Sequence, residues 1–166
     1  MAQLKVSHIS KAFDDQEILK DVSLELGDNE LVSLLGVSGG GKTTLFNVIS
    51  GLLKPEEGQV FLDGKDITGQ PGNVSYMLQK DLLLPYRTIE DNVALPLIIK
   101  GEKKKEARKK ARSYFPEFGL EGTEKKYPSQ LSGGMRQRAA LLRTYMFSDK
   151  IALLDEPFSA LDTLTK

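Results

Sequence analysis

The feature that most constrains this chain is a glycine-rich segment at residues 36–43, with the sequence GVSGGGKT. It follows a short apolar run, residues 31–35, and precedes residues 42–50, which have the pattern of a helix closed by Gly51. Glycines let successive backbone N–H groups turn toward one phosphate, and a helix N-terminus adds positive potential. This order predicts a nucleotide phosphate site in an α/β fold, with residues 31–35 as a strand buried on both faces. An ordinary glycine-rich turn is the weaker alternative.

The polar residues of this loop indicate how it would hold a nucleotide. Lys42 can reach the β- and γ-phosphates, and the Thr43 hydroxyl can ligate Mg²⁺. Taken alone, the loop indicates only a nucleotide phosphate and no particular reaction. The residues predicted to bind the nucleotide here are Gly36, Ser38, Gly39, Gly40, Gly41, Lys42, Thr43 and Thr44.

A second motif joins an apolar segment to two carboxylates. Residues 151–154 are apolar and are followed by Asp155 and Glu156. Sheets of α/β proteins place ligands at the carboxyl ends of their strands, and two acids there are costly unless they bind something. We predict that Asp155 is a partner of Mg²⁺ and that Glu156 is the general base that polarises the attacking water. A strand that simply ends in a polar turn is the alternative.

Residues 131–138, LSGGMRQR, form a second candidate anion site. A serine hydroxyl and glycine N–H groups stand at the start of a helix, which should begin at Ser132 because serine is a common N-cap residue. One γ-phosphate cannot easily serve two helix starts of a single monomer. Apolar residues then recur at helical spacing and predict core packing for Met135, Ala139, Leu142 and Met146.

Together the three motifs resemble those of ABC-type ATPases, whose signature usually reads LSGGQ followed by QR. The resemblance implies that two ATPase domains stack head to tail, with each ATP between the glycine loop of one domain and the signature of the other. It also implies that Ser132, Gly133 and Gly134 bind the nucleotide. Met135 stands where the family usually has Gln, a change from which we expect little loss.

Smaller matches follow in the order of the family. Gln79 matches the glutamine that contacts Mg²⁺ and the attacking water and senses the membrane partner. The resemblance therefore makes Gln79 catalytic together with Lys42 and Glu156. Residues 159–162, SALD, match a loop that communicates across the dimer. Phe13 takes the place of an aromatic ring that stacks on adenine, and a core position is its alternative.

A finer match concerns residues 83–93, which resemble the corresponding segment of importers of the nitrate, sulfonate and taurine type. This resemblance implies an ATP-binding and ATP-hydrolysing subunit that energises solute import from the cytoplasmic face of the membrane. The implied partners are a second ATPase subunit, transmembrane permease subunits and a solute-binding protein. Leu84 and Tyr86 are candidates for the groove that receives the permease, and packing inside the helical part is an equal alternative.

The resemblance also implies an architecture. It predicts a single ABC ATPase domain over residues 1–166, with a P-loop core sheet, an N-terminal antiparallel β subdomain and a helical signature subdomain at roughly 82–140. Alternating or continuous apolar residues predict strands at residues 22–26, 59–62 and 74–78.

The family's domain continues beyond the part matched here. It adds a further central strand that ends in a switch histidine, and the one histidine of this chain, His8, is expected at a surface strand position instead. We therefore expect an incomplete C-terminal part, low stability and weak ATP turnover.

The amino-acid composition argues against several classes of partner and of binding site. The 23 Lys and Arg residues balance the 23 Asp and Glu residues, so no nucleic-acid partner is expected. Without Cys, disulfides and thiolate metal sites are excluded. No segment has the apolar length that spans a bilayer, so a membrane link has to pass through a partner. The charge run at residues 102–112 predicts a helix with a solvated face.

Two rival functions are weighed against transport. A soluble ABC ATPase acting on DNA or ribosomes would carry a long coiled coil or two ATPase units, and the interval between glycine loop and signature is short and lacks heptads. A nucleotide-binding fragment without catalysis is the second rival. Glu156, Lys42 and Gln79 argue against a lineage that lost catalysis, whereas the missing C-terminal part argues for weak activity.

Overall fold

The computed structural model describes residues 3–37, 39–147 and 150–157. The chain forms two compact units, Met1–Val74 and Ser75–Lys166, and each is described by itself. Among the described residues, no helix combines the length and the apolar character needed to cross a membrane.

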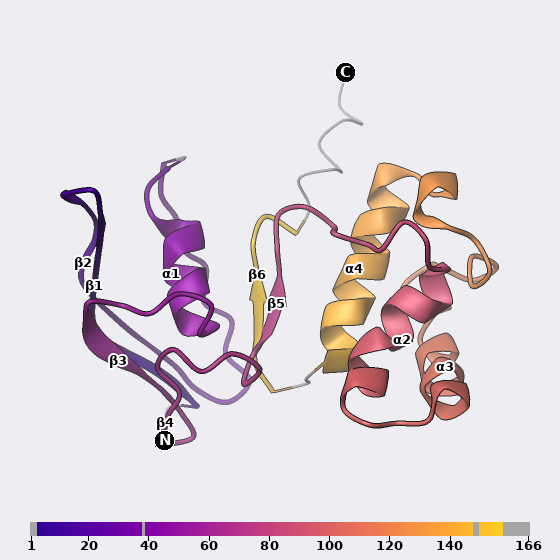
Figure 1. Cartoon of the computed structure of the whole chain (residues 1–166), viewed down its shortest axis with the longest axis horizontal. Helices are drawn as coiled ribbons and strands as arrows, with labels where there is room; N and C mark the ends of the chain where they lie inside the picture. The colour runs from indigo at the N-terminus through magenta and orange to yellow at the C-terminus, as the bar shows by residue number, and fades with distance from the viewer. Residues whose placement is uncertain (1–2, 38, 148–149, 158–166) are drawn as a thin grey trace. The chain divides into compact units, whose positions relative to one another are not determined.

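The first unit is built on an antiparallel sheet with the strand order β2-β1-β3-β4 (Figure 1). The elements of this unit are β1 (Leu4–Phe13), β2 (Gln16–Leu26), β3 (Glu57–Leu62), β4 (Lys65–Asp66) and α1 (Lys42–Ile49). Along β1, Leu4 and Val6 are buried while Lys5 between them is exposed, as a sheet with one covered face requires. The strands predicted at residues 22–26 and 59–62 are confirmed. His8 is exposed on β1, as predicted, with its Nδ1 2.6 Å from Asp21 Oδ1.

The strand predicted at residues 31–35 is wrong. These residues form no strand, and Leu31 and Leu35 are 90% and 94% exposed. A strand with an apolar sequence on both faces is stable only between neighbouring strands that accept its hydrogen bonds and cover its side chains. Among the described residues, none pairs with this segment. The local pattern is therefore that of a central strand, but no described residue of the first unit supplies the pairing that would make it one.

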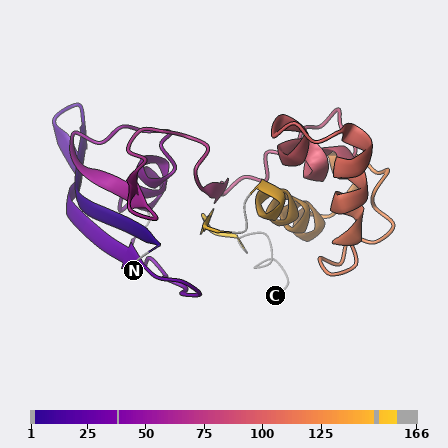
Figure 2. The ribbon, with the colours of Figure 1, turned by 90° about the horizontal axis from the view of Figure 1, so that it is seen from below.

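The second unit combines a short parallel strand pair with three helices. β5 (Ser75–Met77) pairs with β6 (Ala152–Leu154), which confirms the strand predictions at residues 74–78 and 151–154. α2 (Ile89–Ile99) packs against both α3 (Lys104–Ser113) and α4 (Gly133–Phe147), as Figures 1 and 2 show. A single 3₁₀ turn, η1 (Pro128–Gln130), precedes α4.

The apolar core of this unit lies among the three helices and the first strand. It includes Met77, Leu83, Ile89, Val93, Leu97, Phe115, Leu120, Leu131, Ala139, Leu142 and Met146. The stripe predicted along residues 135–146 is confirmed, with Met135 partly buried at its start. Burial of this stripe fixes which way the N-terminus of α4 faces, and that end carries the signature residues.

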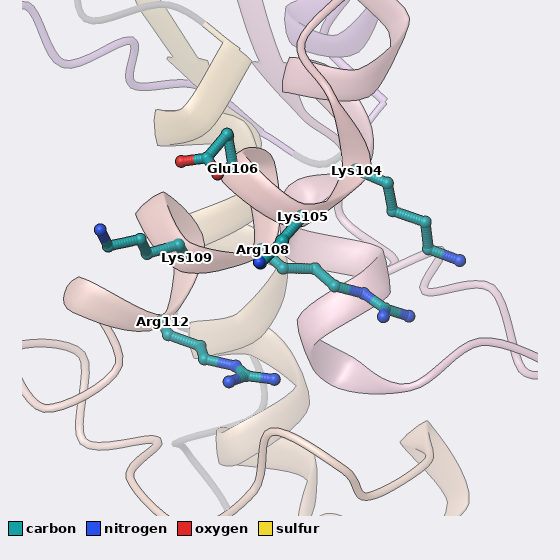
Figure 3. Close-up of a pocket in the computed structure, with 6 residues that line it drawn as sticks. All are labelled: Lys104, Lys105, Glu106, Arg108, Lys109 and Arg112. Carbon is teal, nitrogen blue, oxygen red and sulfur yellow. The ribbon is translucent and has the colours of Figure 1, made fainter.

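The basic helix α3 departs in part from its prediction as a solvated face. Lys105 and Lys109 are exposed, as predicted. A second stripe, with a spacing of four residues, consists of Lys104, Arg108 and Arg112, whose side chains extend to one side of α3 (Figure 3). They form ion pairs with the acidic residues at the start of α2. These three cations lie against the acidic side chains of α2, so part of the charge run is structural.

The partners of that stripe are two carboxylates at the N-terminus of α2. Glu90 is fully buried and binds Arg112, with Arg108 Nε at 3.2 Å and Lys125 Nζ at 3.3 Å from its Oε1. Asp91 accepts two hydrogen bonds of 2.7 Å from Arg108. Burial alone would raise the pKa of Glu90, but hydrogen bonds from Arg112 and Lys125 outweigh it and lower that pKa. α2 and α3, together with the loop at Lys125, are thus joined by charge as well as by the apolar core.

Candidate functional site

The glycine loop of the first unit forms a tight turn ahead of α1. Gly40 N donates to the carbonyl oxygen of Val37 at 3.0 Å. A Cβ atom on Gly40 would lie 2.9 Å from that oxygen, and one on Gly41 would lie 3.0 Å from the carbonyl oxygen of Ile18. Gly41 also has a φ of 82°, which side chains rarely adopt. Side chains are therefore excluded from a backbone cradle that fits a phosphate group.

Lys42 is the first residue of α1 and ends this loop. Its Nζ donates to the carbonyl oxygens of Gly36 at 2.7 Å and Val37 at 2.9 Å. The N-cap residue of α1 is Gly41, which has no side chain to cap the helix, and the first N–H groups of α1 lie at the end of the loop. A phosphate in the cradle would supply anionic oxygens to both the amine and these N–H groups.

The other loop residues that are predicted to bind the nucleotide differ in exposure. Thr43 is exposed and Thr44 is half-buried, both in the first turn of α1. Gly39 is exposed with a φ of 78°. Ser38 lies outside the described residues.

Phe13 ends β1 at the hairpin next to this loop. Its side chain is 46% exposed, and Lys11 Nζ lies 5.4 Å from the ring centroid, so the alternative of a core position is wrong. Phe13 pairs with Gln16, and two residues further along β2 the Ile18 backbone contacts Gly41. An exposed ring beside the phosphate loop is placed for stacking on a base, which stays a prediction.

In the second unit, β6 delivers the two carboxylates. Asp155 is buried, and its N–H donates to the carbonyl oxygen of Met77 at 3.0 Å. Burial, and secondarily the charge of Asp155, raise the pKa of the neighbouring Tyr76 to about 12. Glu156 follows in an exposed position with a φ of 48°. Its Oε2 accepts a hydrogen bond of 2.8 Å from Gln79 Nε2. The candidate base and the candidate water-orienting amide, 77 positions apart in sequence, therefore meet in one contact.

The signature residues occupy the start of α4. This helix begins at Gly133, and Ser132 Oγ accepts a hydrogen bond of 3.3 Å from Met135 N, which confirms the predicted N-cap. Ser132 is exposed, and Gly133 and Gly134 are half-buried. Their placement at a helix start suits an anion, and binding of nucleotide by them stays a prediction.

The residues predicted to bind Mg²⁺ belong to both units. Thr43 belongs to the first unit, whereas Gln79 and Asp155 belong to the second. Within the described ranges, no three or more His, Cys, Asp or Glu residues gather as a cation site. A Mg²⁺ ion here would depend on the oxygens of a nucleotide, as this ion commonly does in proteins. Residues 159–162, predicted to communicate across a dimer, lie outside the described residues.

The segment after Gln79 is organised by Asn92, a residue that the sequence reasoning did not single out. Asn92 is fully buried, and its Oδ1 accepts from Leu84 N at 2.7 Å. Its Nδ2 donates to the carbonyl oxygens of Leu84, Arg87 and Thr88 at 3.0–3.2 Å. Asn92 follows Glu90 and Asp91 in the first turn of α2, so the local sequence gave no signal that distinguishes it. The result is an ordered loop from which Tyr86 projects with 73% of its side chain exposed, so a core position for Tyr86 is wrong.

Replacing Asn92 by Ala should lower the free energy of unfolding by about 2 kcal/mol, because buried backbone groups lose their partners. The measurement is urea denaturation followed by far-UV circular dichroism. Asn73→Ala is the matched control, since that residue loses a single exposed hydrogen bond, to the carbonyl oxygen of Gln70. Equal costs for the two variants would contradict the role given to Asn92.

Residues 19–159 match the family described as ABC transporter. The chain is 46% identical to the formylaminopyrimidine import ATP-binding protein ThiZ of Halalkalibacterium halodurans, over 98% of this chain and 64% of that protein. It is 44% identical to YtlC of Bacillus subtilis, an uncharacterised ABC transporter ATP-binding protein, over 100% of this chain and 65% of that one. The taurine import ATP-binding protein TauB of Escherichia coli O157:H7 is 40% identical, over 98% of this chain and 64% of that protein. The chain thus spans somewhat less than two thirds of the length of these relatives.

Solved structures confirm the fold class. The dimeric ABC transporter cassette MJ0796 superposes with a TM-score of 0.84 and 33% identity, over 96% of this chain and 76% of that one. The ATP-binding cassette MJ1267 superposes with a TM-score of 0.85 and 27% identity, over 96% of this chain and 70% of that chain. The predicted combination of a P-loop ATPase core, an antiparallel β subdomain and a helical signature subdomain is the fold of these cassettes.

Proposed function

Because the chain belongs to the ABC transporter family, we propose that it is the ATP-binding and ATP-hydrolysing subunit that energises solute import. The observation that carries this proposal is the hydrogen bond between Gln79 and Glu156 at the end of β6. A carboxylate without a further role at a strand end would be hydrated, whereas this one is held by an amide that can also bind a water molecule. Relatives named as import ATP-binding proteins support the transport role.

Each of the predicted site residues would have its own role in ATP hydrolysis. The glycine loop and Lys42 would bind the β- and γ-phosphates and neutralise their charge. Glu156 would accept a proton from the attacking water, while Gln79 orients that water. Thr43 and Asp155 would hold a Mg²⁺ ion, which when bound offsets charge on the phosphate oxygens.

A second ATPase subunit is part of the proposal. MJ0796 is described as a dimer, and also in a post-hydrolysis state bound to ADP and Pi. In such a dimer the helix start at Ser132, Gly133 and Gly134 would complete the phosphate site of the partner. The residues placed at the start of α4 are small and uncharged, which lets a phosphate approach the backbone N–H groups.

The remaining proposed partners are transmembrane permease subunits and a solute-binding protein, with the chain at the cytoplasmic face. Of the two residues predicted for the permease groove, Tyr86 is 73% exposed on the loop that Asn92 orders, whereas Leu84 is half-buried. Tyr86, with the neighbouring Leu82 at 53% exposure, offers apolar surface to a permease. The relatives with assigned solutes act in import, which favours transport over a role on DNA or ribosomes.

The experiment that tests nucleotide binding is Lys42→Met, measured by isothermal titration with ATP and Mg²⁺. Loss of a charge-assisted contact to phosphate should weaken ATP binding by about tenfold or more. Lys54→Met, an exposed lysine of the same unit, is the control and should bind as the wild type does. Unchanged affinity of Lys42→Met would refute the phosphate site.

A further inference from the structure

Two arginines of α4 hold the segment that follows Gln79. Arg136 Nε donates to Asp81 Oδ2 at 3.2 Å, while its NH1 donates to the carbonyl oxygen of Leu131 at 2.8 Å. Two turns further along the helix, Arg143 donates to the carbonyl oxygens of Asp81 and Leu82 at 2.7 Å and 2.8 Å. We name Asp81, Arg136 and Arg143 the Asp81 latch. It is a polar connection between the residues after Gln79 and both the start and the middle of the signature helix.

The latch holds a backbone that is unfavourable by itself. Leu82 has a φ of 44°, and with Glu156 it is one of two non-glycine residues of positive φ among the described residues of the second unit. Such conformations cost on the order of 1–3 kcal/mol and persist where surrounding contacts enforce them. Asp81 Oδ1 also accepts from Leu83 N at 3.1 Å, which closes the turn. One of these two residues, Glu156, is itself the acceptor of the Gln79 hydrogen bond, and the other, Leu82, lies three residues after Gln79.

Apolar packing does not position Gln79. Its side chain is exposed and borders an open groove of about 520 Å³, which the latch residues Asp81 and Arg136 also line. Arg143 is half-buried, and burial lowers its pKa while the charge of Asp81 opposes that shift. It still carries its charge at neutral pH, since an arginine retains its proton across that range. Directed, charge-assisted hydrogen bonds therefore set the course of the backbone beyond Gln79.

We infer that the Asp81 latch is a positioning device that ties the location of Gln79, and hence its contact with Glu156, to the signature helix. A displacement of the start of α4 would be carried by Arg136 and Arg143 to the turn at Asp81 and Leu82, two and three residues from Gln79. The inference rests on the proposed function for its consequence in catalysis. The physical link that it requires lies within one unit and is measurable without turnover.

The direct test is the side-chain amide resonance of Gln79 in ¹⁵N NMR spectra of the whole chain. Glu156→Ala removes the acceptor and defines the shift of the unbonded amide. Arg143→Met and Asp81→Asn should each move the resonance from its wild-type position toward that of Glu156→Ala. Backbone amides of residues 80–84 should exchange with solvent about tenfold faster in Arg143→Met, because two charge-assisted hydrogen bonds are lost. Arg138→Met, on the same helix and without a hydrogen bond to this turn, is the control and should change neither signal.

A purely structural role for the arginines gives a different result. In that case the amides of residues 80–84 exchange faster while the Gln79 side-chain resonance stays at its wild-type position, and the inference is overturned. Should Arg143→Met unfold, as loss of the resonances of α2 would show, Arg143→Lys and Asp81→Asn carry the test.

Kinetics separate this inference from the proposed function. The double variant Gln79→Ala with Arg143→Met should turn over ATP no more slowly than Gln79→Ala alone, because the latch acts through Gln79. Additive losses would overturn the inference and leave the ATPase assignment intact. Full turnover in Glu156→Gln would instead overturn the ATPase assignment, while the NMR result would still decide the latch.

Discussion

Glu156→Gln should lower ATP turnover by about 10²- to 10⁴-fold, the range that a positioned general base contributes. The substitution preserves the size of the side chain and removes the carboxylate that would take a proton from the attacking water. Because Glu156 is exposed at the end of β6 and lies outside the apolar core, the fold should not change. ATP affinity should stay within about twofold of the wild type, since the phosphates are held by the loop at Lys42.

The measurement is phosphate release at saturating Mg-ATP, with ATP affinity determined in parallel. Because the chain spans 64% of ThiZ, the variant is assayed in this chain and in a chimera that adds the part of ThiZ that the chain does not cover. Glu117→Gln is the matched control, because it is an exposed glutamate of the same unit for which no loss is expected. Wild-type turnover in both forms of Glu156→Gln would rule out Glu156 as the base and favour a nucleotide-binding module without catalysis.

The second large effect is on stability. Glu90→Gln should lower the free energy of unfolding by about 3 kcal/mol, because removing one partner of a buried ion pair leaves the remaining charges uncompensated. Glu90 is fully buried between cations from α3 and the loop at Lys125, so Gln would place an NH₂ donor where one carboxylate oxygen now accepts, and the negative charge would be lost. Glu106→Gln, the same substitution at an exposed position of α3, should change stability by less than about 0.5 kcal/mol. Urea denaturation of both variants gives the comparison.

The charge cluster also predicts how stability depends on pH. The pKa values of Glu90 and Asp91 are lowered from their ordinary values of 4.5 and 3.8, so protonation favours the unfolded chain. The resulting stability is fully present above pH 4.5 and is lost as the pH falls through the folded-state pKa values. Glu90→Gln should therefore show a smaller loss of stability on acidification than the wild type. An equal loss would mean that Glu90 is not charged in the folded chain.

The parts of the fold that the sequence predicted well are those encoded by short stretches of residues. The N-cap at Ser132, the helix after the glycine loop and the alternation along β2 each depend on a few neighbours, and each was confirmed. Residues 31–35 show the limit of such reasoning. The apolar run of this segment indicates that it needs neighbouring strands and apolar cover on both faces. Those neighbours lie far away in the sequence, and strand formation depends on them.

The same limit applies to the charged residues. The spacing of Lys104, Arg108 and Arg112 places them on one side of a helix, but nothing in the local sequence says that buried acids face that side. Asn92 was overlooked because a lone amide in a helix has no distinctive pattern until its four backbone partners are known.

By itself, the sequence determined the chemistry available to this protein: a phosphate loop ending in Lys42, a carboxylate pair ending in Glu156 and a second helix start at Ser132. These are local features, because glycine conformation, strand ends and helix caps are set by adjacent residues. Only the tertiary structure decided that Gln79 donates a hydrogen bond to Glu156 and that two arginines of α4 donate hydrogen bonds to the turn beyond Gln79. Those contacts join residues 55 to 77 positions apart, and they form only after β5, β6 and the helices have packed.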